Sequence, residues 1–168
     1  MSVPTEQALP AWGRRSGAIE LTKATSARTL EQVADRLEIT ELISRYAWSY
    51  DERDLESLNS VFTPSATWEG KIADKVVIDP VVGRSSIVDW LEDHMKSQTD
   101  QRRHNGLNPL VVSYDGQTAT VLTYLLLTSA NGTSVSLTTT GFYRISALKQ
   151  SSGGWLIDHL FAGFDAPF

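Results

Sequence analysis

The first half of the chain carries apolar side chains at helical spacing. Between residues 30 and 50 they recur every three or four positions, and Thr29 followed by Gln32 is typical of a capping box at the start of a helix. The pattern predicts one long amphipathic helix with a single apolar stripe. The same spacing predicts a short helix over residues 55–62 and a third helix over residues 83–97.

The second half of the chain, after the third helix, is typical of β-strands throughout. Four strand-like runs occupy residues 103–114, 117–129, 134–148 and 155–164. The pairs Asp115-Gly116 and Asn131-Gly132 separate the first three runs, and residues of these types tolerate the positive φ of tight hairpin turns. We therefore predict an antiparallel meander of four long strands.

One further strand is predicted at residues 65–70, whereas residues 71–82 fit either a strand or a loop. The resulting fold class is α+β: a curved antiparallel sheet with three N-terminal helices on its concave face. Such an arrangement encloses a pocket between the two layers. Residues 29–168 are predicted to form a single domain, and residues 1–28, which have no sustained period, a flexible N-terminal arm.

Composition and charge exclude several classes of binding partner. The 168 residues carry a net charge of −5, which disfavours binding to a phosphate backbone, so no nucleic-acid partner is expected. No apolar run has the length of a membrane span or of a secretory signal, so we expect no membrane partner and a cytoplasmic location. The absence of cysteine excludes disulfides, thiolate catalysis and cysteine-ligated metals.

The usual catalytic motifs are absent, and the three histidines are widely separated, so we expect neither a metal site nor a cofactor. The remaining candidate is an acid–base pair. Asp51 lies where the long helix ends, and His104 lies near the start of a strand that should run beneath it. A carboxylate beside an imidazole can orient the ring and stabilise its cation, and Tyr46 could donate a hydrogen bond at the same site.

Structural roles compete with this interpretation. Asp51 could instead cap the second helix, as Asp54 is expected to do, although a carboxylate is disfavoured at a helix C-terminus. His104 could be satisfied by backbone groups, and Tyr46 and Tyr50 could simply pack in the core.

Further residues are candidates for the wall of the pocket. These substrate-binding candidates are Tyr50, Trp68, Asn105, Tyr124 and His159. Two of them have a structural alternative. Strand alternation allows His159 to be either a core residue or a pocket wall, and Asn105 could serve bulge geometry near Pro109.

Three stretches resemble a known family. They are "RLEITELISRYAWSYDERDLESLNSVF", "RRHNGLNPLVVSYDGQTATVLTYLLL" and "GGWLIDHL". Together they are similar to the SnoaL-like, or nuclear transport factor-like, domains, whose fold is a cystatin-like α+β cone. Within this group, scytalone dehydratase, bile-acid 7α-dehydratase and hexachlorocyclohexane dehydrochlorinase have Asp and His at positions matching Asp51 and His104. The bile-acid enzyme also has a tyrosine matching Tyr46.

The resemblance implies a cofactor-independent lyase or isomerase that acts on a small, apolar, cyclic substrate such as a steroid, terpenoid or polyketide. Asp51 would orient His104, His104 would move the proton and Tyr46 would donate a hydrogen bond. The alternative is a non-catalytic binding or assembly module of the same fold, or the small subunit of a ring-hydroxylating dioxygenase. Under either interpretation the exposed sheet faces favour association, and we expect a homodimer or homotrimer.

Overall fold

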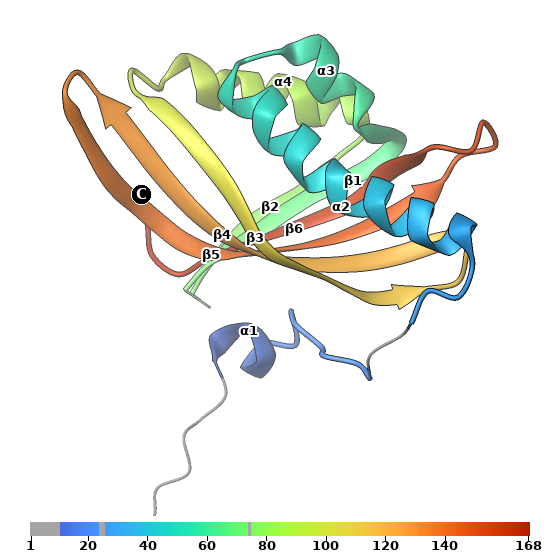
Figure 1. Cartoon of the computed structure of the whole chain (residues 1–168). Coiled ribbons are helices and arrows are strands. Elements are labelled where there is room, and N and C mark those ends of the chain that lie inside the picture. Colours follow the sequence, from blue (N-terminus) through green and yellow to red (C-terminus); the bar gives the residue numbers. More distant parts are fainter. Residues whose placement is uncertain (1–10, 24–25, 74) are drawn as a thin grey trace, which may run out of the picture.

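The structure is a computed structural model that describes residues 11–23, 26–73 and 75–168. Helices lie over one strongly curved sheet (Figure 1), which confirms the α+β class. The helices are α1 (Trp12–Arg15), α2 (Leu30–Asp51), α3 (Leu55–Ser60) and α4 (Arg84–Lys96). The strands are β1 (Phe62–Ile72), β2 (Val76–Val82), β3 (Gln101–Tyr114), β4 (Thr118–Asn131), β5 (Ser134–Lys149) and β6 (Trp155–Phe164). Helices α2, α3 and α4 cover the concave face, as predicted.

The sheet has the strand order β2-β1-β6-β5-β4-β3. Strands β3 to β6 form the predicted antiparallel meander, and Gly116 and Gly132 adopt positive φ in its first two turns. Strands β1 and β6 pair in parallel, so the sheet is mixed rather than wholly antiparallel. An alternating pattern reports which side chains share a face and not the direction of a neighbouring strand, so this pairing could not be predicted from it.

The predicted boundary of the second helix is wrong. Helix α3 ends at Ser60, and Phe62 already belongs to β1, where it pairs with Ile157. The Val61 carbonyl accepts a hydrogen bond from the Ile157 N–H at 2.8 Å. Pairing with β6 therefore ends the helix before Pro64 is reached. Residues 71–82, which fitted a strand or a loop, contain the end of β1 and all of β2.

Helix α2 buries only part of its predicted apolar stripe. Its inward face carries Ile39, Leu42, Ile43, Tyr46 and Tyr50, all of which are buried. On the opposite side of the helix Leu30, Val33 and Leu37 are exposed, so their predicted burial is wrong. The reason is geometric: at 3.6 residues per turn the position of Asp35, not those three, continues the inward face.

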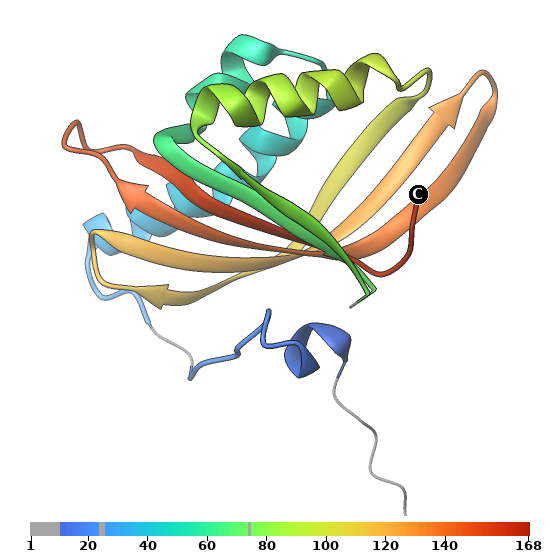
Figure 2. The same cartoon turned by 180° about the vertical axis from the view of Figure 1, so that it is seen from behind.

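Residues 11–23 cross the convex face of the sheet, opposite the three larger helices (Figures 1 and 2). The Trp12 ring lies 5.1 Å from that of Phe142 on β5, and its Nε1 donates a hydrogen bond to Asp165 at 2.7 Å. The described part of the segment is therefore attached to the sheet by an aromatic contact. Residues 1–10 and 24–25 of the predicted flexible arm lie outside the described residues, and the domain boundary at residue 28 stays a prediction.

Asp35 is a buried carboxylate on the inward face of the first half of α2. It accepts hydrogen bonds from Tyr114 at 2.6 Å and Trp155 at 3.0 Å, and it pairs with Lys149 at 3.0 Å. Burial raises the pKa of Asp35, but the bonds from Trp155, Tyr114 and Lys149 outweigh it and hold the pKa below its ordinary value of 3.8. The charged form therefore ties α2 to β3, β5 and β6.

We expect Asp35→Asn to lower the free energy of unfolding by about 1–3 kcal/mol at pH 7, because it leaves Lys149 without its buried partner. Since the folded pKa is depressed, this contribution is present above the unfolded value and disappears as the pH falls through the folded value. The gap between wild type and variant should thus close as the pH drops below about 4 in urea titrations.

Asp93→Asn is the matched control, since Asp93 pairs with Lys96 on the exposed side of α4. It should change stability by less than about 0.5 kcal/mol. Equal effects of the two variants, or a gap that does not depend on pH, would contradict the assigned role of Asp35.

Candidate functional site

The end of α2 meets β3 at a carboxylate–imidazole pair. The Asp51 Oδ1 lies 2.6 Å from Nδ1 of His104, and its Oδ2 accepts the His104 backbone N–H at 2.7 Å. The two side chains are 5% and 10% exposed. With Nδ1–H donating to the carboxylate, Nε2 is the basic nitrogen of the neutral ring, and it has no hydrogen-bond partner in the part of the chain that the structure describes.

Asp54, and not Asp51, is the N-cap of α3. Its carboxylate accepts the Ser57 N–H at 3.0 Å. Asp51 instead faces β3. The backbone and ring donors of His104 explain why a carboxylate can sit at a helix C-terminus, where the macrodipole disfavours negative charge.

A glycine allows α2 to lie this close to β3. A Cβ at Gly106 would stand 2.5 Å from Cγ2 of Ile43 on α2. Ile43 is about two helical turns before Asp51, and Gly106 is two positions after His104 on the same side of the strand. The contact at one end of this short span therefore sets the distance between acid and imidazole at the other.

Two more interactions join the end of α2 to β3, one of them a weak, half-exposed ion pair. The Gln101 side chain donates to the Asp51 carbonyl at 2.9 Å, and Arg103 forms an ion pair with Glu52 at 3.1 Å. The first satisfies one of the carbonyls that a helix C-terminus leaves without an intrahelical partner. Asp51 is thus held at both its backbone and its side chain.

A cavity of about 410 Å³ lies between the concave face and the helices, and His104 forms part of its wall. Among the predicted site residues, Tyr46, Tyr50 and Trp68 also line it. The other lining residues are Ile72, Ile78, Trp90, Leu91, His94, Ser97, Gln98, Arg102, Tyr143, Phe164, Pro167 and Phe168. Its volume is in the range of small-molecule sites.

Two tyrosine hydroxyls reach this cavity in defined states. Tyr46 accepts a hydrogen bond from Nε1 of Trp68 at 3.1 Å, which leaves its own proton available for donation. Burial raises the pKa of Tyr46 well above its ordinary value, so the hydroxyl stays protonated. The Tyr50 hydroxyl accepts from Gln98 at 2.8 Å, and its ring meets the His104 ring edge-on, 4.9 Å between centroids.

Three predicted wall residues lie outside this cavity. Tyr124 is 60% exposed and pairs in register with Phe142, whose ring contacts Trp12 on the convex face. Asn105 donates to the Leu126 carbonyl at 3.1 Å. We therefore correct these assignments: both side chains belong to the face opposite the cavity.

His159, the third predicted wall residue, also lies outside the cavity. Its Nε2 lies 2.9 Å from the carboxylate of Glu69, and the neighbouring Leu160 is the fully buried one. The register between β5 and β6 shifts between Ser146 and Ala147, next to His159. That irregularity turns His159 away from the core, and simple alternation from Trp155 does not reveal it.

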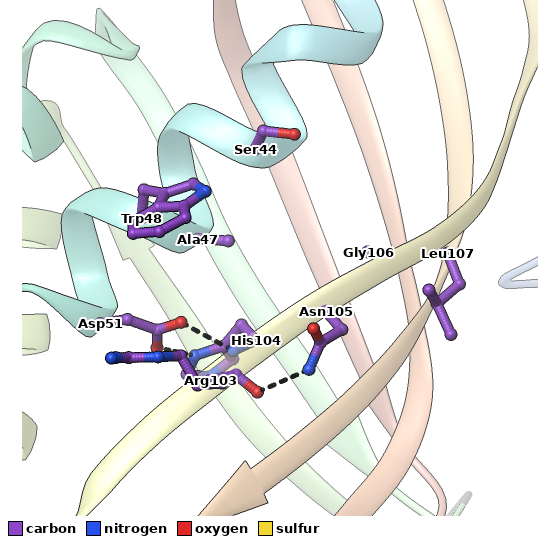
Figure 3. A pocket seen from close by; sticks show the side chains of 9 residues that line it. All are labelled: Ser44, Ala47, Trp48, Asp51, Arg103, His104, Asn105, Gly106 and Leu107. Atoms are coloured by element: carbon purple, nitrogen blue, oxygen red, sulfur yellow. Dashed lines mark hydrogen bonds and ion pairs between the residues drawn. The ribbon is translucent and has the colours of Figure 1, made fainter.

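Asn105 does line a second, smaller pocket of about 220 Å³ on the outer side of the dyad (Figure 3). Ser44, Ala47 and Trp48 of α2 form one wall of it, and residues 103–107 form the other. The Asp51 carboxylate and His104 lie between this pocket and the larger cavity, since His104 lines both. The larger cavity is the better candidate for substrate because it is mostly apolar and aromatic.

Sequence reasoning missed several cavity residues. Arg102 precedes His104 by two positions on the same strand, so alternation alone would have put both side chains on one face. His94 is exposed on α4 but also lines the cavity, and its ring lies 4.2 Å from that of Trp90. No sequence pattern indicated Phe168 as a cavity residue, because only folding brings its ring beside Arg102 on β3.

No group of three or more histidine, aspartate or glutamate side chains lies close enough to hold a metal ion within the described ranges. None of the described helices combines the length and the apolar character that a membrane crossing requires.

The SnoaL-like domain profile matches residues 31–160, most of the chain. The chain belongs to the SnoaL-like domain family. A search of curated proteins found no match. Similar solved structures include a protein of unknown function from Mycobacterium tuberculosis, with 25% identity and a TM-score of 0.68, covering 80% of this chain and 74% of that one.

Two other structures similar to this SnoaL-like chain share its fold. One is assigned as the β subunit of an aromatic-ring-hydroxylating dioxygenase from Novosphingobium aromaticivorans: 14% identity, TM-score 0.70, covering 83% of this chain and 94% of that one. The other is ActVI-ORFA from Streptomyces coelicolor: 17% identity, TM-score 0.67, covering 77% and 97%. At such identities these likenesses concern the fold.

We expect Gly106→Ala to lower the free energy of unfolding by about 1–3 kcal/mol, because the new methyl group overlaps Ile43. The same variant should weaken the hydrogen bond between Asp51 and His104, seen as an upfield shift of the His104 Nδ1–H resonance in NMR spectra.

Replacing Ile43 by Leu in the Gly106→Ala background removes the branch at Cβ and should restore part of both losses. Gly154→Ala is the control, since no atom lies within 4 Å of a Cβ built there. If Gly106→Ala is as mild as Gly154→Ala, the close approach does not control the pair.

Proposed function

We propose that this SnoaL-like protein is a cofactor-independent lyase or isomerase that uses Asp51 and His104 to move a proton on a small cyclic substrate. The observation that carries the proposal is the contact of 2.6 Å between Asp51 and Nδ1 of His104 at the wall of the cavity. A module that only binds a ligand has no need of an oriented base with its other nitrogen unpaired.

The proposed step is an elimination next to a carbonyl group. Nε2 of His104 takes a proton from the carbon beside the carbonyl, and the C–H electron pair becomes the new C=C bond as the C–O bond on the next carbon breaks. The departing hydroxide takes a proton from the His104 imidazolium and leaves as water. Asp51 stabilises the cation in between, and Tyr46 donates a hydrogen bond to the carbonyl oxygen.

The cavity wall supports a largely apolar substrate. Aromatic rings of Trp68, Trp90 and Phe164 supply flat surfaces, and the volume of about 410 Å³ suits a small fused-ring compound. Isomerisation would use the same base without loss of the hydroxyl group. The pair therefore supports the type of reaction, and the wall supports the class of substrate.

We expect Asp51→Asn and His104→Ala each to lower kcat by at least about 10²-fold, because one loses the orienting charge and the other the base. The elimination can be measured as the conversion of a β-hydroxytetralone to the fluorescent naphthol. Affinity for the unreactive tetralone should stay within about tenfold of wild type.

Glu52→Gln is the matched control for the acid. Glu52 adjoins Asp51, but its side chain is about half exposed and pairs with Arg103 outside the cavity. It should leave kcat within about twofold. Unchanged turnover in His104→Ala, or equal loss of binding and turnover in both dyad variants, would rule the proposal out.

Assembly is the second candidate role, and one observation favours it. An exposed apolar group lies on the convex face of β3, β4 and β5; we call it the convex patch. It consists of Leu107, Leu110, Tyr124, Val135 and Leu137. Apolar clusters of this kind on a sheet face mark association surfaces, and we propose that two copies of the chain meet there as a homodimer.

Replacing Tyr124 and Leu137 together by Lys should convert the dimer to a monomer, because it puts four charges into a two-fold interface. Light scattering after size exclusion measures the mass. Lysine at Leu30 and Leu37, exposed on α2, gives the comparison and should not change it. A monomeric wild type would remove the convex patch as a self-association surface.

A further inference from the structure

The main cavity contains one permanently charged side chain, Arg102. Its wall has no aspartate or glutamate, and the other polar lining groups are tyrosines, histidines, Ser97, Gln98 and tryptophan N–H groups. The side chain of Arg102 is 19% exposed. A mostly apolar cavity in a protein of net charge −5 therefore presents a cation beside the candidate base.

Two contacts fix the position of the Arg102 side chain. Its Nε lies 3.4 Å from Oδ2 of Asp100, and its guanidinium lies over the ring of Phe168, 5.6 Å from the centroid. Asp100 also accepts the hydroxyl of Ser129, which holds the pKa of that carboxyl below its ordinary value. Arg102 is thus positioned by a carboxylate on one side and an aromatic face on another.

These contacts leave most of the guanidinium donors unused. A guanidinium has five N–H groups, and only Nε–H is engaged, at a long distance; the terminal nitrogens have no partner among the described residues. A simple structural pair with Asp100 would use the two-pronged geometry that arginine and carboxylate favour. Because Arg102 lines the cavity, these donors are available to an acceptor on a ligand bound there.

We propose that Arg102 binds a carboxylate of the ligand, so that the cavity selects cyclic, largely apolar molecules carrying one carboxylate. That this ligand is also the substrate rests on the proposed function. Recognition of its carboxylate by Arg102 does not require catalysis. Arg102 and His104 project from the same face of β3 two positions apart, so a carboxylate on Arg102 anchors the ring system beside Nε2.

Naphthoate and naphthamide test this, since they share a ring system and differ in charge. Trp68 and Trp90 line the cavity, so quenching of tryptophan fluorescence reports binding, and calorimetry checks it. At pH 8.5, where imidazoles are ordinarily neutral, wild type should bind naphthoate at least about tenfold more tightly than naphthamide.

Arg102→Met should abolish that preference and keep naphthamide affinity within about threefold, whereas Arg102→Lys should keep part of it. Arg103→Met is the matched control: Arg103 is the next residue, but it pairs with Glu52 outside the cavity. It should keep the full preference. Thermal unfolding of each variant separates lost recognition from lost folding.

The two proposals fail separately. His104→Ala should keep the preference for naphthoate, whatever it does to turnover. A wild type that binds both probes equally, or an equal effect of the Arg102 and Arg103 variants, overturns carboxylate recognition and leaves the dyad untouched. Full turnover in His104→Ala with an intact preference overturns the proposed lyase alone.

Discussion

The close approach of α2 to β3 is the contact on which the site depends. At Gly106 the strand presents backbone, not a side chain, to Ile43, and the helix can lie directly against the edge of the sheet. Two turns later the helix ends at Asp51, which meets both the ring and the backbone of His104. His104 is also part of the cavity wall, so packing and chemistry share one constraint.

Much of the fold followed from the sequence because its signals are local. Helical spacing, the Thr29 cap and the Asp-Gly and Asn-Gly turns each concern a few neighbouring residues, and they predicted the three larger helices and the meander. What failed needed long-range information. The parallel pairing of β1 with β6 joins the two ends of the domain, and the burial of Asp35 in place of Leu30 and Leu37 depends on the orientation of α2.

The candidate site divides in the same way. Asp51 and His104 were proposed from their places at element ends and from the family resemblance, and the structure has them in contact. Asn105, Tyr124 and His159 were put on the wrong face. For His159 a register shift in β6 reverses the alternation. Asn105 is adjacent to His104 on β3, so strand parity alone puts its side chain on the other face, whereas the face of Tyr124 depends on a β3–β4 register that contains two irregularities. Arg102 needed only that parity, whereas Phe168 needed the whole fold.

The double contact of Asp51 separates two duties at position 104. One carboxylate oxygen binds the main-chain N–H, which every residue except proline provides, and the other binds the imidazole. The backbone contact therefore fastens helix to strand regardless of which side chain stands there. A chain built like this can exchange its reactive group during evolution, or in the laboratory, and still keep its architecture, so new chemistry can arise at this position without first rebuilding the protein around it.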